Sequence, residues 1–253
     1  MRIDAYHATI TVAAALVISL SILDYFGFYA EPLSQAADVV TAGAAVWFAA
    51  LELEQYGVEE TLPHRESWIL FSAGIGCRLT SEVIYQIYGA YGNVAPIPSV
   101  GNTFSLAGYA MIVLGMLLYV RHYTKALTRT KLAAIGVIVA SAALVGFFSL
   151  LSPQGVAVLS APGVETLAVL YTITHFLGLT SALLGFAVFA QSGESRTWLA
   201  MIGATLLTVM GDLVFAYAFI NPSYTLFVAD NGVGAMSYTL FALAFQLHRK
   251  QSG

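Results

Sequence analysis

Two residues of opposite charge lie one helical turn apart inside a long apolar run. Arg78 and Glu82 are four positions apart, which places both side chains on one face of an α-helix. A charge at the centre of a membrane costs about 3 kcal/mol or more, so a charged residue in such a run is a functional candidate. The pair could simply neutralise itself, or Arg78 could supply a fixed cation for a carboxylate or a phosphate.

A second acid and a histidine occupy comparable positions in the C-terminal half. Asp212 lies in its own apolar run where Glu82 lies in the first half, and both are predicted to lie past the midplane, towards the outside. An arginine flanked by two acids from related helices predicts a preorganised polar site. His175, near the middle of another run, could hydrogen-bond a neighbouring helix or act as a pH-dependent switch.

Other polar residues have ordinary structural roles as alternatives. Asp38, Asp230 and the two asparagines of the candidate set lie near predicted helix N-termini, where such side chains accept bonds from unpaired N–H groups. Glu52 and Glu54 are expected to be solvated near a cytoplasmic helix end. We assign no catalytic residue and no metal ligand. The predicted ligand-binding residues are Arg78, Glu82, Asn102, Tyr109, His175, Asp212, Asn231 and Tyr238.

The composition predicts that these residues are carried by membrane-spanning helices. The chain has 253 residues, of which 58% are hydrophobic and 9% charged, and its mean hydropathy is +0.79. A soluble domain carries about 25% charged residues. We predict a single all-α membrane domain of eight helices, with seven left open because the fifth apolar run is the least distinctive. The predicted spans are 8–30, 34–56, 67–91, 100–121, 131–152, 164–191, 196–220 and 225–247.

The positions of lysine and arginine predict the orientation. Nine of the ten cationic residues fall in loops or ends on one side of an eight-span arrangement, and Arg78 is the tenth. Because cationic residues are enriched in cytoplasmic loops, we expect a multi-pass protein of the cell membrane with both termini in the cytoplasm. The nine are Arg2, Arg65, Arg121, Lys125, Arg129, Lys131, Arg196, Arg249 and Lys250.

The two halves of the sequence share a pattern. Residues 66–92 and 194–220 each begin with Glu-Ser and a tryptophan, pass through a glycine-containing helix to an acid, and end in aromatic residues. An asparagine followed seven positions later by a tyrosine comes after each. The pattern predicts two parallel four-helix repeats, residues 1–125 and 126–253, with a site at their interface.

One stretch resembles a family. Ser81-Glu82, Tyr88, Pro96-Ile97-Pro98-Ser99, Asn102, Gly108-Tyr109 and Arg121 resemble a pattern in multi-helix membrane input regions of bacterial and archaeal signalling proteins. Those regions are commonly fused to histidine kinase or diguanylate cyclase domains. Asn102 stands where that family usually has aspartate, and no output domain follows Gly253. The resemblance therefore implies a sensory input module that acts with a separate cytoplasmic or membrane partner.

Several cofactors and functions are disfavoured by particular residues. The lysines, at 125, 131 and 250, all fall in predicted cytoplasmic segments, so a covalent retinal pigment is not expected, and we predict no other cofactor. No basic nucleic-acid-binding patch is present. Lipid is the expected surrounding partner; the oligomeric state stays open.

Three functions fit these residues. The first is a sensor or binding module in which a small polar or amphipathic molecule, or a proton, binds near Arg78. The second is an intramembrane enzyme that acts on a lipid or isoprenoid with Glu82 or Asp212 as general acid or base. The third is a small-molecule transporter that uses the interface between the repeats. We favour the first, which involves no catalysis, and leave open whether the chain is an enzyme.

Overall fold

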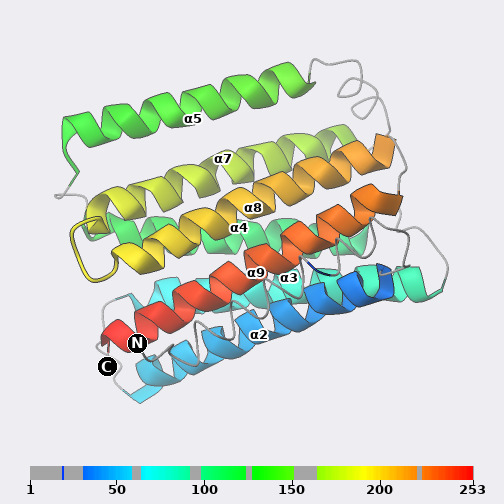
Figure 1. Ribbon diagram of the computed structural model, residues 1–253. Helices are drawn as coiled ribbons and strands as arrows, with labels where there is room; N and C mark the ends of the chain where they lie inside the picture. The colour runs from blue at the N-terminus through cyan, green and yellow to red at the C-terminus, as the bar shows by residue number, and fades with distance from the viewer. Residues whose placement is uncertain are drawn as a thin grey trace.

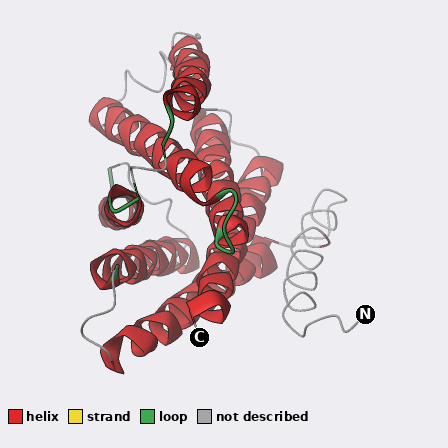
Figure 2. Ribbon diagram, turned by 90° about the vertical axis from the view of Figure 1, so that its left-hand side faces the viewer, coloured by secondary structure: helices red, strands yellow, loops and turns green. Residues whose placement is uncertain are grey.

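The part of the chain that the structure describes is helical throughout. A computed structural model describes residues 31–58, 64–91, 98–123, 127–150, 164–220 and 224–252, together with Ser19. Within them no strand is present (Figure 2). The helices are α2 (Glu31–Val58), α3 (Arg65–Ala90), α4 (Val100–Arg121), α5 (Arg129–Leu150), α7 (Val164–Phe189), α8 (Ser195–Ile220) and α9 (Tyr224–Ser252).

The observed helices agree with seven of the predicted spans. The largest difference in a boundary is at the end of α9, which reaches Ser252 where 247 was predicted. The fifth apolar run does form a helix, α5. The predicted span at 8–30 lies outside the described residues, apart from Ser19, which is helical.

Six helices pack in a closed ring. α2 packs against α3, α3 against α4, α4 against α7, α7 against α8, α8 against α9, and α9 returns to α2. α5 packs on the outside of α7 and stands apart from the ring in Figure 1. The ring therefore encloses side chains from both halves of the sequence.

Glycine allows α3 and α4 to approach closely. A Cβ atom added to Gly108 would lie 2.6 Å from the carbonyl oxygen of Gly74 and 3.1 Å from Cγ of Arg78. A Cβ added to Gly74 would meet the Gly108 carbonyl oxygen at the same distance. Small residues at a helix contact let backbones approach in this way. The contact brings the backbone that carries Arg78 directly against α4.

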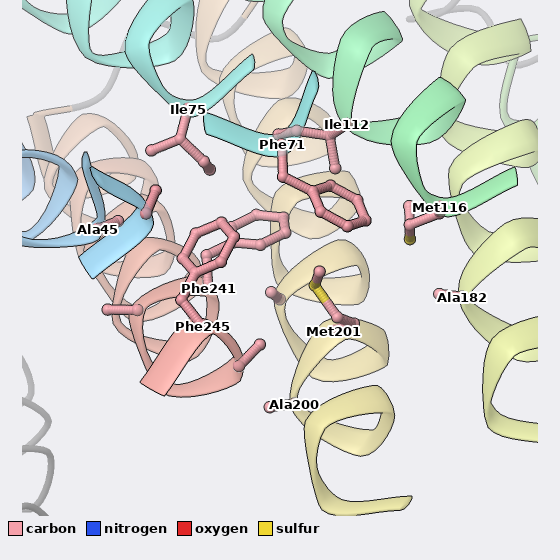
Figure 3. Close-up of a cluster of buried hydrophobic side chains, with 14 of the residues drawn as sticks. Ala45, Phe71, Ile75, Ile112, Met116, Ala182, Ala200, Met201, Phe241 and Phe245 are labelled. Carbon is pink, nitrogen blue, oxygen red and sulfur yellow. The ribbon is translucent and has the colours of Figure 1, made fainter. Parts of the chain in front are cut away.

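An apolar layer fills the middle of the ring. Phe71 and Ile75 of α3, Ile112 and Met116 of α4, and Met201, Phe241 and Phe245 from α8 and α9 are buried and face one another (Figure 3). Their burial removes a large apolar area from solvent and packs the helices at fixed spacing. The buried polar side chains lie on either side of this layer along the helix axes.

Four of the helices are long and apolar enough to cross a membrane. The apolar segments are Gln35–Glu54, Val100–Arg121, Thr166–Phe189 and Ser195–Val214. The cationic residues of the described helices, apart from Arg78, gather at one end of the bundle, on the left in Figure 1. They are Arg65, Arg121, Arg129, Lys131, Arg196, Arg249 and Lys250.

Candidate functional site

Arg78 is buried and is contacted from three helices. Its Nη1 donates to Oγ of Ser105 on α4, and its Nη2 lies 3.9 Å from Oε1 of Glu82 on α3. The guanidinium carbon lies 5.5 Å from the ring centroid of Tyr238 on α9, a cation–π contact. Tyr238 also donates its hydroxyl to Oε1 of Glu82 at 2.7 Å. The structure thus joins three of the predicted residues, Arg78, Glu82 and Tyr238, into one cluster.

Asp38 extends this cluster, although it was predicted to lie at a helix N-terminus. That prediction was wrong, because α2 begins at Glu31, two turns earlier. Asp38 is 5% exposed and lies against Glu82, within electrostatic reach of Arg78. Among the described residues no donor lies within hydrogen-bond distance of its Oδ1, and a Cβ on Gly234 of α9 would lie 3.0 Å from that atom. The carboxyl group is therefore enclosed between α2, α3 and α9.

Asp230 was also expected at a helix N-terminus, and it too lies further inside. It is in the second turn of α9, which begins at Tyr224. It is half-buried, and the charged groups that act on it most strongly are Asp212, Glu82 and Arg78. Its position adds a fourth carboxyl group to those of Asp38, Glu82 and Asp212.

His175 and Asp212 form a neighbouring group between α7 and α8. Nε2 of His175 lies 2.6 Å from Oδ2 of Asp212, and neither atom has a further hydrogen-bond partner among the described residues. The Tyr109 ring meets the imidazole edge-on, with 5.1 Å between centroids, and its buried hydroxyl interacts with the Thr205 side chain of α8. Asp212 also acts electrostatically on Arg78. The predicted residues His175, Asp212 and Tyr109 are therefore adjacent to the Arg78 cluster.

The two predicted asparagines have different environments. Asn102 forms a capping box with Ser99 at the start of α4, and its Nδ2 donates to the hydroxyl of Tyr85 at 2.7 Å. This is the helix-terminal role that the sequence left open. Its backbone carbonyl accepts from Tyr171 of α7 at 3.2 Å. Asn231 is half-buried on α9 beside Asp230.

Glu52 was expected to be solvated, and this expectation was wrong. Its side chain is fully buried, whereas Glu54, two residues further along α2, is exposed. Oε1 of Glu52 lies 2.6 Å from Nδ1 of His248 on α9. The two residues lie at the end of the bundle where the cationic residues gather, opposite to the Arg78 cluster.

Ser105, Asp38 and Glu52 were missed for identifiable reasons. Ser105 is four residues before Tyr109 and so lies on the same face of α4, but a serine in a helix carries no distinctive signal. For α2 a signal was present. Asp38, Ala42, Ala45, Ala49 and Glu52 recur at alternating intervals of four and three residues, and all five are buried. This spacing defines one face of a helix and indicates that both acids point inwards.

No protein-family model, no curated protein and no solved structure matches the chain.

Proposed function

We propose that the chain is a multi-pass membrane module that senses a stimulus bound at the Arg78 cluster. The proposal takes eight membrane spans, with the span at 8–30 added to the seven described helices, and both termini in the cytoplasm. Four sufficiently apolar helices and the gathering of cationic residues at one end support this topology. The Arg78 cluster then lies in the outer half of the bundle.

We further propose that the bundle consists of two parallel repeats. In the ring, α2, α3 and α4 are followed by α7, α8 and α9, so the order of neighbouring helices is the one expected of two halves related by a half-turn. Gly74 corresponds to Ala204, 130 residues later, and Gly108 corresponds to Ser237, 129 residues later. The tight contact of Gly74 with Gly108 therefore has a counterpart, in which Ser237 donates to the carbonyl oxygen of Ala204 at 2.9 Å. The same offset relates Tyr119 to His248, which contact each other. These matched contacts support a duplicated origin and a site at the interface of the halves.

The balance of charge in the cluster indicates which stimulus it accepts. Four carboxyl groups, those of Asp38, Glu82, Asp212 and Asp230, surround one guanidinium and one imidazole. If all four were ionised, the cluster would carry a net negative charge even with His175 protonated. A net charge in a low-dielectric interior is costly, and carboxyl groups avoid it by taking up protons. The cluster is therefore suited to bind positive charge.

Packing favours the proton among positively charged ligands. Arg78 is 9% exposed, and Tyr109 and Tyr238 are each 1% exposed. A proton needs no cavity, and it can move along carboxyl, imidazole and hydroxyl groups that already touch. The observation that carries the proposal is the contact of two carboxyl groups, Asp38 and Glu82, beside a single buried arginine.

The response would be read at the cytoplasmic ends of the ring. Protonation changes the forces between α2, α3 and α9, which meet at Asp38, Glu82 and Tyr238. Rearranged helix ends could then be recognised by a signalling partner, as the resemblance to membrane input regions suggests. A change of shape requires that the two protonation states favour different arrangements.

An intramembrane enzyme is the second candidate, and one contact favours it. The 2.6 Å approach of His175 to Asp212, beside the ring of Tyr109, is the arrangement of a general base and its orienting acid. Conversion of a lipid or isoprenoid substrate that is lost in both Asp212→Asn and His175→Gln would establish this alternative in place of sensing.

A pH titration of helix movement tests the sensing proposal. After Cys77→Ser, spin labels at the exposed positions 121 and 196 report the separation of α4 and α8 in the full chain in lipid nanodiscs. We expect the distance distribution to change with pH, and the change to shift or vanish in Glu82→Gln. Glu66→Gln, an exposed acid on the same helix, is the control and should behave as wild type. A distribution independent of pH would contradict the proposal.

A further inference from the structure

A second chain of titratable groups lies at the opposite end of the ring. Oε1 of the buried Glu52 lies 2.6 Å from Nδ1 of His248, and Nε2 of His248 lies 3.1 Å from the hydroxyl of Tyr119. Tyr119 donates that hydroxyl to Oε2 of Glu194 at 2.9 Å. Glu194 is half-buried in the turn before α8. The four groups form a continuous path from a fully buried carboxyl group to the surface.

The number of protons in this chain follows from its geometry. Three hydrogen bonds that join four groups in a line require three protons. In their ordinary forms at neutral pH, two carboxylates, a neutral imidazole and a phenol supply two. Without a third proton, two lone pairs would face each other at one of the contacts. The four hydrogen-bonded groups together therefore hold one proton more than the same groups would hold separately at neutral pH.

The extra proton lies between Glu52 and His248. Tyr119 gives its only proton to Glu194, so its oxygen accepts from Nε2–H of His248. Nδ1 of His248 and Oε1 of Glu52 then share one proton, as imidazolium and carboxylate or as imidazole and carboxylic acid. Loss of this proton would leave a nitrogen lone pair 2.6 Å from a carboxylate oxygen. The contact between α2 and α9 thus depends on the proton.

We propose that Glu52, His248, Tyr119 and Glu194 form a proton-binding relay that fastens α2 to α9. A proton enters and leaves through Glu194, passes along Tyr119 and His248, and is held against Glu52. Because α2 and α9 are the two helices whose contact closes the ring, release of the proton loosens that closure. This relay is separate from the Arg78 cluster, since the apolar layer of Phe71, Met201 and their neighbours lies between them.

The relay has other titratable groups as neighbours. His64, at the start of α3, stacks on Tyr119 with 4.2 Å between ring centroids and contacts the Tyr123 hydroxyl at 2.9 Å. Burial, helped by the charges of His122 and His248, lowers the pKa of His64 from 6.5 to about 4, so it stays neutral at neutral pH. Glu54 on α2 is exposed. Among the described residues, the other titratable or charged groups at this end are Arg65, Glu66, Arg121, His122, Arg129, Lys131, Arg196, Arg249 and Lys250.

The test compares stability against pH for the full chain in detergent micelles above about pH 7.5, one unit above the ordinary pKa of histidine. There His64 is largely neutral in the unfolded chain as well as in the folded chain. A folded state that binds one proton more than the unfolded state becomes less stable as pH rises, by a factor of ten in the unfolding equilibrium per pH unit. We expect this loss in wild type and a flatter curve in Glu52→Gln, whose amide donates to Nδ1 without an added proton. Glu54→Gln should show the same dependence of stability on pH as wild type. Glu82→Gln changes the Arg78 cluster and leaves the relay intact, so the loss of stability that depends on Glu52 should still be present in it.

A spectroscopic measurement on wild type keeps the proposal testable if Glu52→Gln does not fold. The ring signals of His248 in ¹⁵N-histidine NMR spectra are assigned by their loss in His248→Asn. We expect one of two results. Either both ring nitrogens of His248 carry protons, or only Nε2 does and the infrared spectrum shows a protonated Glu52 carboxyl group. A His248 protonated at one nitrogen with no protonated carboxyl assignable to Glu52 would overturn the proposal. So would a Glu52→Gln curve that matches wild type.

Discussion

The two buried polar regions of the bundle share one face of α2 and differ in what balances their charge. Asp38 belongs to the Arg78 cluster and Glu52 to the relay, and 14 residues, about 21 Å of helix, separate them. The Arg78 cluster contains a permanent cation, because a guanidinium does not lose its proton in proteins. The relay contains no permanent cation among the groups that form it, and a single shared proton takes that role.

This difference determines how each region responds to a change in pH. In the proposed sensing role the positive charge of Arg78 is constant and the surrounding acids bind protons, so the net charge of the cluster changes with pH. In the relay, the titrating proton is itself the contact between Glu52 and His248. The first arrangement is suited to detection and the second to holding two helices together.

The largest expected effect comes from removing the permanent cation. Arg78→Ala leaves Asp38 and Glu82 without their counter-charge, and breaking a buried ion pair costs about 3 to 5 kcal/mol. We expect a markedly lower unfolding temperature at neutral pH that is partly restored in acid, where the carboxyl groups are neutral. A variant as stable as wild type at neutral pH would show that Arg78 does not balance the acids.

Closing the gap between α3 and α4 should disturb the Arg78 cluster and spare the relay. In Gly108→Ala the new methyl group meets the Gly74 backbone and the Arg78 side chain, so we expect a loss of about 1 to 3 kcal/mol. Thermal unfolding measures this loss. Gly76→Ala, where no atom lies within 4 Å of the added Cβ, should cost nothing. Equal effects of the two substitutions would refute the close contact.

Two tyrosines at matching positions of the halves should behave differently. Tyr238→Phe removes the hydroxyl bond to Glu82, and a bond to a charged group is worth about 1.5 to 3 kcal/mol. Tyr109→Phe removes a buried hydroxyl whose side-chain partner is the uncharged Thr205, so the loss should be smaller, about 0.5 to 1.5 kcal/mol. Chemical unfolding of both variants gives the comparison. A larger loss in Tyr109→Phe would reverse the roles assigned to the two halves.

The smallest effect concerns His64, whose pKa is lowered to about 4. Between pH 6.5 and about 4 the unfolded chain binds a proton at this position that the folded chain does not, so stability falls as pH falls through this range. This is opposite in sign to the relay. In His64→Asn, which suits the positive φ of 79° at this position, the acid-side decline should be shallower in thermal unfolding curves. If stability fell as steeply with falling pH in His64→Asn as in wild type, the loss of stability in acid would come from groups other than His64.

The helices could be predicted from the sequence because each apolar run ends at proline, glycine or charge. Their arrangement in a ring could not, since hydropathy gives the length of a helix and not its neighbours. The shared pattern at Glu82 and Asp212 did indicate that two helices face a common region. It could not indicate that Asp212 would pair with His175 of α7, because a hydrophobic pattern does not show which face of one helix packs against its neighbour.

The polar residues were predictable to different degrees. Arg78 and Glu82 stood out because charge is rare in an apolar run. Asp38 was assigned to a helix end because the start of α2, marked by Pro32 in its first turn, lies three residues before the predicted start. Glu52 was expected to be solvated because it lies near the predicted cytoplasmic end of the same helix. Counting from that proline, together with the spacing of the alanines between them, would have placed both acids on the inner face.

The most direct measurement is the infrared spectrum of carboxyl groups in the full chain at neutral pH. The account holds that the Arg78 cluster neutralises its excess acids by binding protons. It predicts a carbonyl band of protonated carboxylic acid that weakens in Asp38→Asn and persists in the exposed control Glu66→Gln. A wild-type spectrum with every carboxyl group ionised would contradict it.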